Sequence, residues 1–374
     1  MIKVTNQQEF DSIVSNTPTN SLVLIYPNVE GIAYNLSKYW SVGSNTYVRG
    51  IGYPKIQYSE AYTGSALKGA INVKSSDGQR FENITIEGLH FIGNNKRTGP
   101  VCGICLYDMG MAGDTSISEN PKGRHDSSTV GRNNNLMNGI FVNDCIIENF
   151  YSGIYLSVCM NSFITNNIIF NCEEDGISLE WSYTSIISNN KIHNAQYGIY
   201  NNGSEENIYS NNDIYNCLKN GFLITKAKRL IVLNNVVSNI LLNAVDIDYS
   251  EENIISNNVI KNNGGYGVNL IGCIKNTING NIIVNNSGES MIVDNKSSRN
   301  SISSNSIYNN SYGIFSRSSS QNAYFGNSLL SNGDGIYFEN TSDSLVYANI
   351  SKNFNDNYYI KSGTNNTIKD LYNK

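Results

Sequence analysis

The 374-residue sequence is poor in histidine, proline, tryptophan and charge, and it has no long apolar run. It contains three His, five Pro and two Trp residues, and 15% of its residues are charged. No apolar stretch approaches the ~18 residues that a membrane-spanning helix needs, so we expect no membrane span. Lys3 is not followed by the apolar core of a signal peptide. A cytoplasmic, a phage-borne and a secreted protein with its signal removed remain open.

The sequence also lacks a basic surface. The formal net charge is −5, and the Lys and Arg residues are scattered apart from Lys226, Lys228 and Arg229. Phosphate backbones are bound by concentrated positive charge. We therefore expect no nucleic-acid partner.

The cysteines fit neither disulfide pairing nor zinc binding. There are seven, an odd number, and Cys102 and Cys105 have no second CxxC pair to complete a zinc site. Cys172 and Cys217 occupy the same position of a repeat. Unpaired Cys is commonly a small buried residue, so we expect reduced, structural thiols.

From about residue 139 the sequence repeats itself. A Gly followed by an apolar residue recurs at intervals of about 22–23 residues, a period typical of solenoids. Ala244 and Ser290 take the Gly position in two of the units. The glycines are Gly153, Gly176, Gly198, Gly221, Gly267, Gly313 and Gly335.

Two columns of asparagine run through the same repeats. Asn tolerates left-handed backbone angles, and stacked Asn side chains can bond one another in ladders. A residue repeated so regularly indicates scaffold, not catalysis. The first column is Asn167, Asn190, Asn212, Asn235, Asn258, Asn281, Asn305, Asn327 and Asn349. The second is Asn171, Asn194, Asn216, Asn239, Asn262, Asn285, Asn309, Asn332 and Asn353.

Between these columns, apolar and polar residues alternate over three to five positions, which is strand periodicity. Upstream, the segments 46–56, 69–75 and 83–93 have the same character. Residues 1–20 begin with a helix signal that starts at Thr5 and places Phe10, Ile13 and Val14 on one face. We expect this helix to cap the open end of the solenoid. The sequence thus predicts one all-β solenoid domain over 1–374, with regular repeats over 139–370.

The G-I-x-L and N-N-x-I-x-N repeats resemble the parallel β-helix repeat of the pectate-lyase-like superfamily, including NosD-like proteins. The resemblance covers about residues 20–370 and implies a right-handed single-stranded parallel β-helix of about 12 coils. The same repeat serves lyases, hydrolases, epimerases, phage tailspikes and adhesins. The Gly-His-Gly motif of polygalacturonases and the Asp-Pro-His motif of alginate epimerases are both missing.

Alternation predicts two outward-facing columns on the strands that follow each Gly-apolar pair. They vary far more than the Asn columns, as a binding face on a regular scaffold should. The first outward column is Cys105, Tyr155, Ser178, Tyr200, Leu223, Asp246, Asn269, Ile292, Phe315 and Tyr337. The second outward column is Tyr107, Ser157, Glu180, Asn202, Thr225, Asp248, Ile271, Asp294, Arg317 and Glu339.

Asp246 and Asp248 are the main catalytic candidates. Two positions apart on one strand, their Cα atoms are expected ~6.8 Å apart, near the lower end of the roughly 6.5–9.5 Å between the carboxylates of inverting glycosidases. Asp294, two coils further along, is a candidate for substrate binding. An Asp-x-Asp pair can also hold Ca²⁺, so a calcium cofactor stays open. The plainest alternative is two solvated acids on an exposed strand.

Glu180 is a further catalytic candidate, beside Trp181. Aromatic faces on an exposed groove are what sugar rings stack upon, so Trp181, Tyr155, Tyr200 and Tyr249 are substrate-binding candidates. The competing explanation is that Tyr is simply enriched in strands.

Residues 109–138 interrupt the period. The segment is polar and Gly-rich, and a long insertion on a repeat scaffold commonly lies on the binding face. If it folds over the groove, His125 can act in acid–base catalysis and Arg124 can bind substrate.

These features favour a carbohydrate-active enzyme acting on a polysaccharide or oligosaccharide. As a glycoside hydrolase it would use Asp246 and Asp248 as acid and base. As a polysaccharide lyase it would neutralise a uronate with a carboxylate-bound cation, while Lys226 or Arg124 removes a proton. The alternative is a non-catalytic glycan-binding or adhesive β-helix, such as a phage tail or surface protein. Either a monomer or a homotrimer is compatible.

Overall fold

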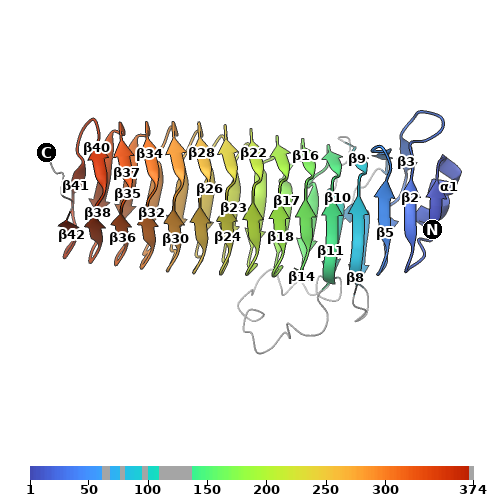
Figure 1. Cartoon of the computed structure of the whole chain (residues 1–374), viewed down its shortest axis with the longest axis horizontal. Helices are drawn as coiled ribbons and strands as arrows, with labels where there is room; N and C mark the ends of the chain where they lie inside the picture. The colour runs from blue at the N-terminus through green and yellow to red at the C-terminus, as the bar shows by residue number, and fades with distance from the viewer. Residues whose placement is uncertain (61–67, 76–80, 95–99, 109–136, 370–374) are drawn as a thin grey trace, which may run out of the picture. The chain divides into compact units, whose positions relative to one another are not determined.

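The computed structural model describes residues 1–60, 68–75, 81–94, 100–108 and 137–369. The chain divides into two compact units, unit 1 (Met1–Ala195) and unit 2 (Gln196–Lys374). Each is a right-handed parallel β-helix in which every full coil contributes one strand to each of three sheets, A, B and C in that order (Figure 1). There are about 14 turns in all, slightly more than the 12 expected, because the first coils lack the Gly-apolar signature.

In unit 1 the strands are short and parallel throughout. Sheet A contains β1 (Ile2–Val4), β2 (Leu22–Ile25), β5 (Tyr47–Gly50), β8 (Glu82–Glu87), β11 (Met137–Asn143), β14 (Cys159–Met160), β15 (Phe163–Thr165) and β18 (Ile186–Ser188). Sheet B contains β3 (Tyr34–Leu36), β6 (Lys55–Tyr58), β9 (His90–Ile92), β12 (Ile146–Glu148), β16 (Ile168–Phe170) and β19 (Lys191–His193). Sheet C contains β4 (Trp40–Ser41), β7 (Lys68–Ser75), β10 (Val101–Asp108), β13 (Ile154–Ser157) and β17 (Asp175–Glu180).

Unit 2 continues the same pattern. Sheet A contains β21 (Ile208–Ser210), β24 (Ile231–Leu233), β27 (Ile254–Ser256), β30 (Thr277–Asn279), β33 (Ser301–Ser303), β36 (Ala323–Phe325), β39 (Leu345–Tyr347) and β42 (Thr367–Lys369). Sheet B contains β22 (Asp213–Tyr215), β25 (Val236–Ser238), β28 (Val259–Lys261), β31 (Ile282–Val284), β34 (Ser306–Tyr308), β37 (Ser328–Leu330) and β40 (Ile350–Lys352). Sheet C contains β20 (Tyr197–Asn202), β23 (Phe222–Thr225), β26 (Val245–Asp248), β29 (Val268–Ile271), β32 (Met291–Asp294), β35 (Tyr312–Arg317), β38 (Asp334–Glu339) and β41 (Tyr358–Ile360).

The first Asn column is a buried ladder, as predicted. In unit 2, Asn258 donates through Nδ2 to Oδ1 of Asn281 and to the carbonyl of Val232, both at 3.0 Å. It accepts on Oδ1 from the backbone N–H and the Nδ2 of Asn235, at 2.8 and 3.0 Å. Each Asn therefore ties three coils together, and its buried polar groups are satisfied.

The second Asn column lies elsewhere. Asn262 and Asn285 are exposed at corners with φ of 58° and 55°, the left-handed angles that Asn tolerates. Asn332 and Asn353 do not lie at these corners but form part of a separate ladder, which the sequence did not predict. The repeat shifts by one residue there, so that Ser331 takes the left-handed corner. That second ladder comprises Asn263, Asn286, Asn310, Asn332 and Asn353, and a third comprises Asn253, Asn276, Asn300 and Asn322.

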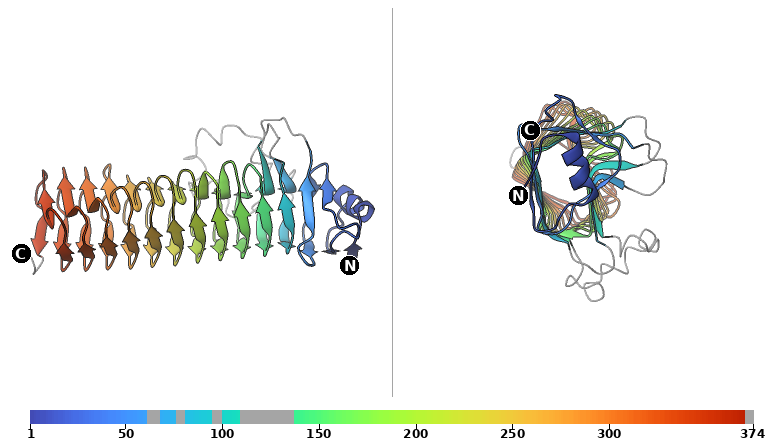
Figure 2. Two further views of the ribbon diagram at one scale, coloured as in Figure 1. Left: turned by 90° about the horizontal axis from the view of Figure 1, so that it is seen from above. Right: turned by 90° about the vertical axis from the view of Figure 1, so that its right-hand side faces the viewer.

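Helix α1 (Gln7–Ser15) covers the first coils of unit 1, as expected (Figure 2). The side chain of Asn6 caps its N-terminus by accepting from the N–H of Glu9 at 3.0 Å. Phe10, Ile13 and Val14 are its buried residues. Phe10 packs against Tyr34 and Trp40, with ring centroids 4.9 and 5.7 Å apart. The helix thus closes apolar core that would otherwise meet water.

Two compositional expectations can be compared directly with the described residues. All seven cysteines are unpaired and buried, which confirms the structural assignment. Among the helices within those ranges, none is long and apolar enough to cross a membrane.

Candidate functional site

The two outward columns exist in register on sheet C of unit 2. The first runs through Tyr200, Leu223, Asp246, Asn269, Ile292, Phe315, Tyr337 and Tyr359. The second runs through Asn202, Thr225, Asp248, Ile271 and Asp294, and then pairs Arg317 with Glu339. Alternation along short strands therefore predicted the register of these columns.

Asp246 is held by three amide groups from three different coils. Its Oδ2 accepts from Nδ2 of Asn220 and of Asn243, each at 3.0 Å, and its Oδ1 accepts from Nδ2 of Asn269 at 2.8 Å. Asn220 and Asn243 lie in the turns that lead into sheet C, and Asn269 is the next residue in the first outward column. These three amide groups fix the orientation of the Asp246 carboxylate.

Asp248 has the opposite environment. Its Oδ1 is buried and has no hydrogen-bond partner in the described part of the chain. Burial, and secondarily the negative charge of Asp246, raise the pKa of Asp248 to about 6. One strand therefore carries a carboxylate held by amide groups, Asp246, and a second carboxyl, Asp248, whose proton is retained to higher pH.

Asp294 is paired with Arg317, a cation that the sequence did not mark as its partner. Its Oδ2 accepts from Nε of Arg317 at 3.0 Å and also from Nη2 of the same side chain, and its Oδ1 accepts from the N–H of Asn295 at 2.6 Å. Both oxygens of Asp294 are thus engaged within the protein. Arg317 could have been found by reading the second outward column one coil past Asp294.

Tyr249 supplies an exposed aromatic surface beside this group. It occupies the corner after Asp248 with φ of 48° and is 62% exposed. Its ring lies against Gly272, where a Cβ would come within 2.7 Å of ring atom Cδ1, and its hydroxyl accepts from Nδ2 of Asn295 at 3.2 Å. Gly272 therefore gives Tyr249 room to extend over the next coils. The same corner is left-handed in neighbouring coils, with φ of 51° at both Lys226 and Asn295, so this backbone angle belongs to the repeat.

Tyr200 and Lys226 are two further candidates in unit 2. Tyr200 is two coils before Asp246 in the first outward column and contacts Tyr197, with ring centroids 6.2 Å apart. Lys226 is an exposed corner residue whose backbone N–H donates to the carbonyl of Asp248 at 3.0 Å.

In unit 1, Glu180 and Tyr155 form a pair on sheet C. The Tyr155 hydroxyl donates to Oε2 of Glu180 at 2.9 Å. Burial raises the pKa of Glu180, although this hydrogen bond acts in the other direction. Trp181 follows the end of β17 at a corner with φ of 52°. Glu180 belongs to unit 1, whereas the Asp246–Asp248 pair belongs to unit 2.

The expectation that the first outward column faces solvent throughout was wrong at four positions. Cys105, Ser178, Asn269 and Ile292 are all 5% exposed or less. Asn269 turns its amide to Asp246. Gly69 packs so closely that an added Cβ would lie 2.5 Å from Cβ of Cys105. His125 and Arg124 lie outside the described residues, as does most of the segment 109–138.

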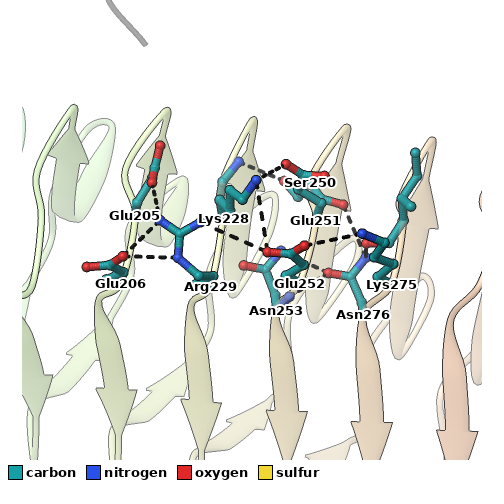
Figure 3. A network of polar contacts seen from close by, with 12 residues as sticks. Glu205, Glu206, Lys228, Arg229, Ser250, Glu251, Glu252, Asn253, Lys275 and Asn276 are labelled. Carbon is teal, nitrogen blue, oxygen red and sulfur yellow. Dashed lines mark hydrogen bonds and ion pairs between the residues drawn. The ribbon is translucent and has the colours of Figure 1, made fainter. Parts of the chain in front are cut away.

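Two cations of the small basic group, Lys228 and Arg229, are paired with acidic residues of neighbouring coils (Figure 3). Arg229 Nη2 lies 2.7 Å from Glu205 Oε2 and 2.8 Å from Glu206 Oε1. Lys228 is bonded to Glu251, and Lys275 lies 3.4 Å from Glu252. Alternating charge from coil to coil makes this a cross-coil network.

A metal site finds little support in the donor set. Within the described ranges, no three His, Cys, Asp or Glu side chains gather as a metal ion requires. Ca²⁺ takes six to eight oxygen ligands, more than the carboxylates of Asp246 and Asp248 can supply. The suggestion of calcium at the Asp-x-Asp pair therefore gains nothing from the geometry.

Comparison with solved structures gives the fold. The chain is similar to the A-module of the mannuronan C-5 epimerase AlgE4 of Azotobacter vinelandii, with a TM-score of 0.69, 14% identity, and 98% of this chain and 96% of that chain covered. It is similar to the pre-mature gene product 12 of bacteriophage phi29, with a TM-score of 0.72, 13% identity, and 98% and 56% covered. It also resembles PfbA, a surface adhesin of Streptococcus pneumoniae, with a TM-score of 0.54, 14% identity, and 95% and 87% covered.

Sequence comparison gives the family. No curated protein matches the chain at a significant level. The family described as "right handed beta helix region" matches residues 69–237 and 182–307, together more than half of the sequence. With the parallel coils of both units, this match shows that the chain belongs to the right-handed β-helix family.

Proposed function

We propose that the protein is a glycoside hydrolase that cleaves a polysaccharide along sheet C of unit 2, with Asp248 as the general acid and Asp246 as the base. The observation that carries this proposal is the contrast between the two carboxylates. Asp246 accepts three amide hydrogen bonds, whereas Oδ1 of Asp248 is buried with no partner among the described residues. A carboxyl group whose pKa is raised by burial, as that of Asp248 is, can keep the proton that a general acid must donate.

The spacing supports the same assignment. Residues i and i+2 of a strand project from one face with Cα atoms ~6.8 Å apart. Inverting glycosidases hold their carboxyl groups roughly 6.5–9.5 Å apart so that a water molecule fits beside the sugar. Asp248 would donate its proton to the leaving-group oxygen, while Asp246 would take a proton from the attacking water. The proton count is restored when the two acids exchange protons with solvent.

The neighbouring residues fit a sugar-binding role. Tyr249, which is 62% exposed, offers a ring face one residue from Asp248, and aromatic faces provide apolar contact area for pyranose rings. The similar AlgE4 module is, by its name, an epimerase of mannuronan, so this fold is compatible with a polymeric sugar substrate. The similar adhesin PfbA represents the competing candidate, a β-helix that binds a glycan without cleaving it.

The test is an assay of cleavage and binding on one set of soluble polysaccharides. Wild type should release new reducing ends. Asp248→Asn and Asp246→Asn should each lose at least about 100-fold in rate, as expected when an acid or base is removed, and should still bind the polymer. Asp213→Asn on sheet B is the matched control and should keep full activity.

Three outcomes would contradict the proposal. Binding without any cleavage by wild type would favour the non-catalytic alternative. An unsaturated product that absorbs ultraviolet light would identify a lyase instead. Equal activity of Asp248→Asn and Asp213→Asn would remove Asp248 from the chemistry.

A further inference from the structure

An aromatic cluster on sheet C of unit 2 lies C-terminal to the acid pair. Phe315, Tyr337 and Tyr359 continue the first outward column beyond Asp246, on consecutive coils. Their ring centroids are 5.1 Å apart from Phe315 to Tyr337 and 4.9 Å apart from Tyr337 to Tyr359. Tyr312 adds a fourth ring, 5.6 Å from Phe315 and 5.5 Å from Tyr337.

The cluster lies along the same line as the acids. Asp246 is followed by Asn269, Ile292 and then Phe315 in register. At ~4.8 Å per coil, Phe315 is about 14 Å from Asp246 along the solenoid axis. A ligand that contacts both the acids and the rings must therefore be an extended chain.

The rings are positioned to contact a ligand as well as one another. Tyr359 is 42% exposed, and Phe315, Tyr337 and Tyr312 are only part-buried. Ring pairs on adjacent strands stabilise a sheet, but that role does not require them to stay open to solvent. Aromatic side chains left accessible in a row are typical of binding surfaces.

The charges on these columns disfavour an acidic ligand. From β26 to the residue after β41, the outward columns carry the carboxylates Asp246, Asp248, Asp294 and Glu339, against the cations Arg317 and Lys361. Both cations are already bonded to carboxylates. Arg317 binds Asp294, and Lys361 Nζ donates to Glu339 Oε1 at 2.8 Å.

Each of these cations neutralises its partner carboxylate, which leaves Asp246 and Asp248 as the acids of these columns outside an ion pair. A polyuronate would bring one negative charge per sugar to this acid pair. Like charges brought together at an interface cost affinity and slow association. An uncharged chain avoids this repulsion while keeping the apolar contact with the rings.

We infer that this face takes an uncharged polysaccharide, laid along the solenoid axis from the Asp246–Asp248 pair to the Phe315–Tyr337–Tyr359 cluster. The inference rests on the proposed function and specifies its substrate class. It assigns the aromatic cluster as accessory sugar-binding subsites three to five coils from the acids.

The experiment measures binding of the intact protein to soluble polymers of both kinds by affinity electrophoresis and calorimetry. The uncharged probes are galactomannan, xyloglucan and mixed-linkage glucan, and the polyuronates are alginate and polygalacturonate. We expect an uncharged polymer to bind and both polyuronates to fail at physiological ionic strength. Tyr337→Ala and Tyr359→Ala should each weaken binding roughly tenfold, the effect of losing ~1.4 kcal/mol of ring contact.

The matched controls are Tyr308→Ala on sheet B and Tyr347→Ala on sheet A, which are 37% and 52% exposed and should leave affinity unchanged. Preferential binding of a polyuronate would overturn the inference but leave a polysaccharide-acting protein intact. Binding of neither class would overturn the proposed function itself. If folded Tyr359→Ala, checked by circular dichroism, binds as tightly as the controls, the cluster is not a subsite.

Discussion

Burial of the Asp248 carboxyl lowers the stability of the folded protein at neutral pH. The pKa of Asp248 is raised from its ordinary value to about 6, chiefly by burial. The folded state therefore binds the proton more tightly than the unfolded chain does. This group's contribution favours folding at low pH and is lost as the pH rises from about 4 through 6.

We accordingly predict that Asp248→Asn stabilises the protein at pH 7.5 by on the order of 1 kcal/mol, and has little effect at pH 4. A shift of two units corresponds to about 2.7 kcal/mol, which we reduce because water still reaches part of this side chain. Thermal unfolding of wild type and variant at both pH values measures the difference. Asp213→Asn controls for loss of one negative charge, and a destabilised Asp248→Asn at pH 7.5 would contradict the account.

At the scale of single residues, the sequence indicated the two acids as candidates but did not show which residues surround them. The two-residue spacing of Asp246 and Asp248 was sufficient to select them. The amide groups that hold Asp246 come from Asn220, Asn243 and Asn269, which are brought together only by the coil register. Side chains that converge from three coils cannot be recognised until that register is known.

At the scale of single elements, the buried Asn ladders carry much of the order between coils. Asn258 makes two donor and two acceptor contacts and is 1% exposed. Replacing it leaves the backbone N–H of Asn235 and the carbonyl of Val232 without their partner. Each buried polar group left unsatisfied costs about 1–3 kcal/mol.

We predict that Asn258→Ala lowers the free energy of unfolding by about 2–4 kcal/mol, measured by denaturant unfolding. Asn257→Gly is the matched control. Asn257 is exposed with φ of 55°, an angle that Gly adopts readily, so this change should cost well under 1 kcal/mol. Equal losses for the two variants would show that burial of the ladder contributes nothing.

The third Asn ladder could not be recognised from the sequence pattern. Asn253, Asn276, Asn300 and Asn322 form it, but Ser344 takes the next place. Mixed Ser and Asn do not stand out as a column in the sequence. The structure identifies them as equivalent because both side chains accept from the backbone N–H of the preceding coil.

For the whole molecule, the fold was predictable because one rule is repeated in every coil. Gly-apolar pairs, left-handed Asn corners and alternating short strands all indicate the same solenoid. The proposed function depends instead on positions that differ from coil to coil, such as Asp246, Asp248 and Tyr249. A residue type that occurs in only one coil produces no periodic pattern, so only its chemical character indicates a role.

The most direct test of the account is the pH dependence of polysaccharide cleavage by wild type and Asp248→Asn. If Asp248 is the general acid, the wild-type rate should fall above a midpoint near pH 6, where burial has placed the pKa of this carboxyl. Asp248→Asn should be inactive at every pH while still binding the polymer. A wild-type rate that keeps rising above pH 7, or full activity of Asp248→Asn, would contradict the assignment of the site.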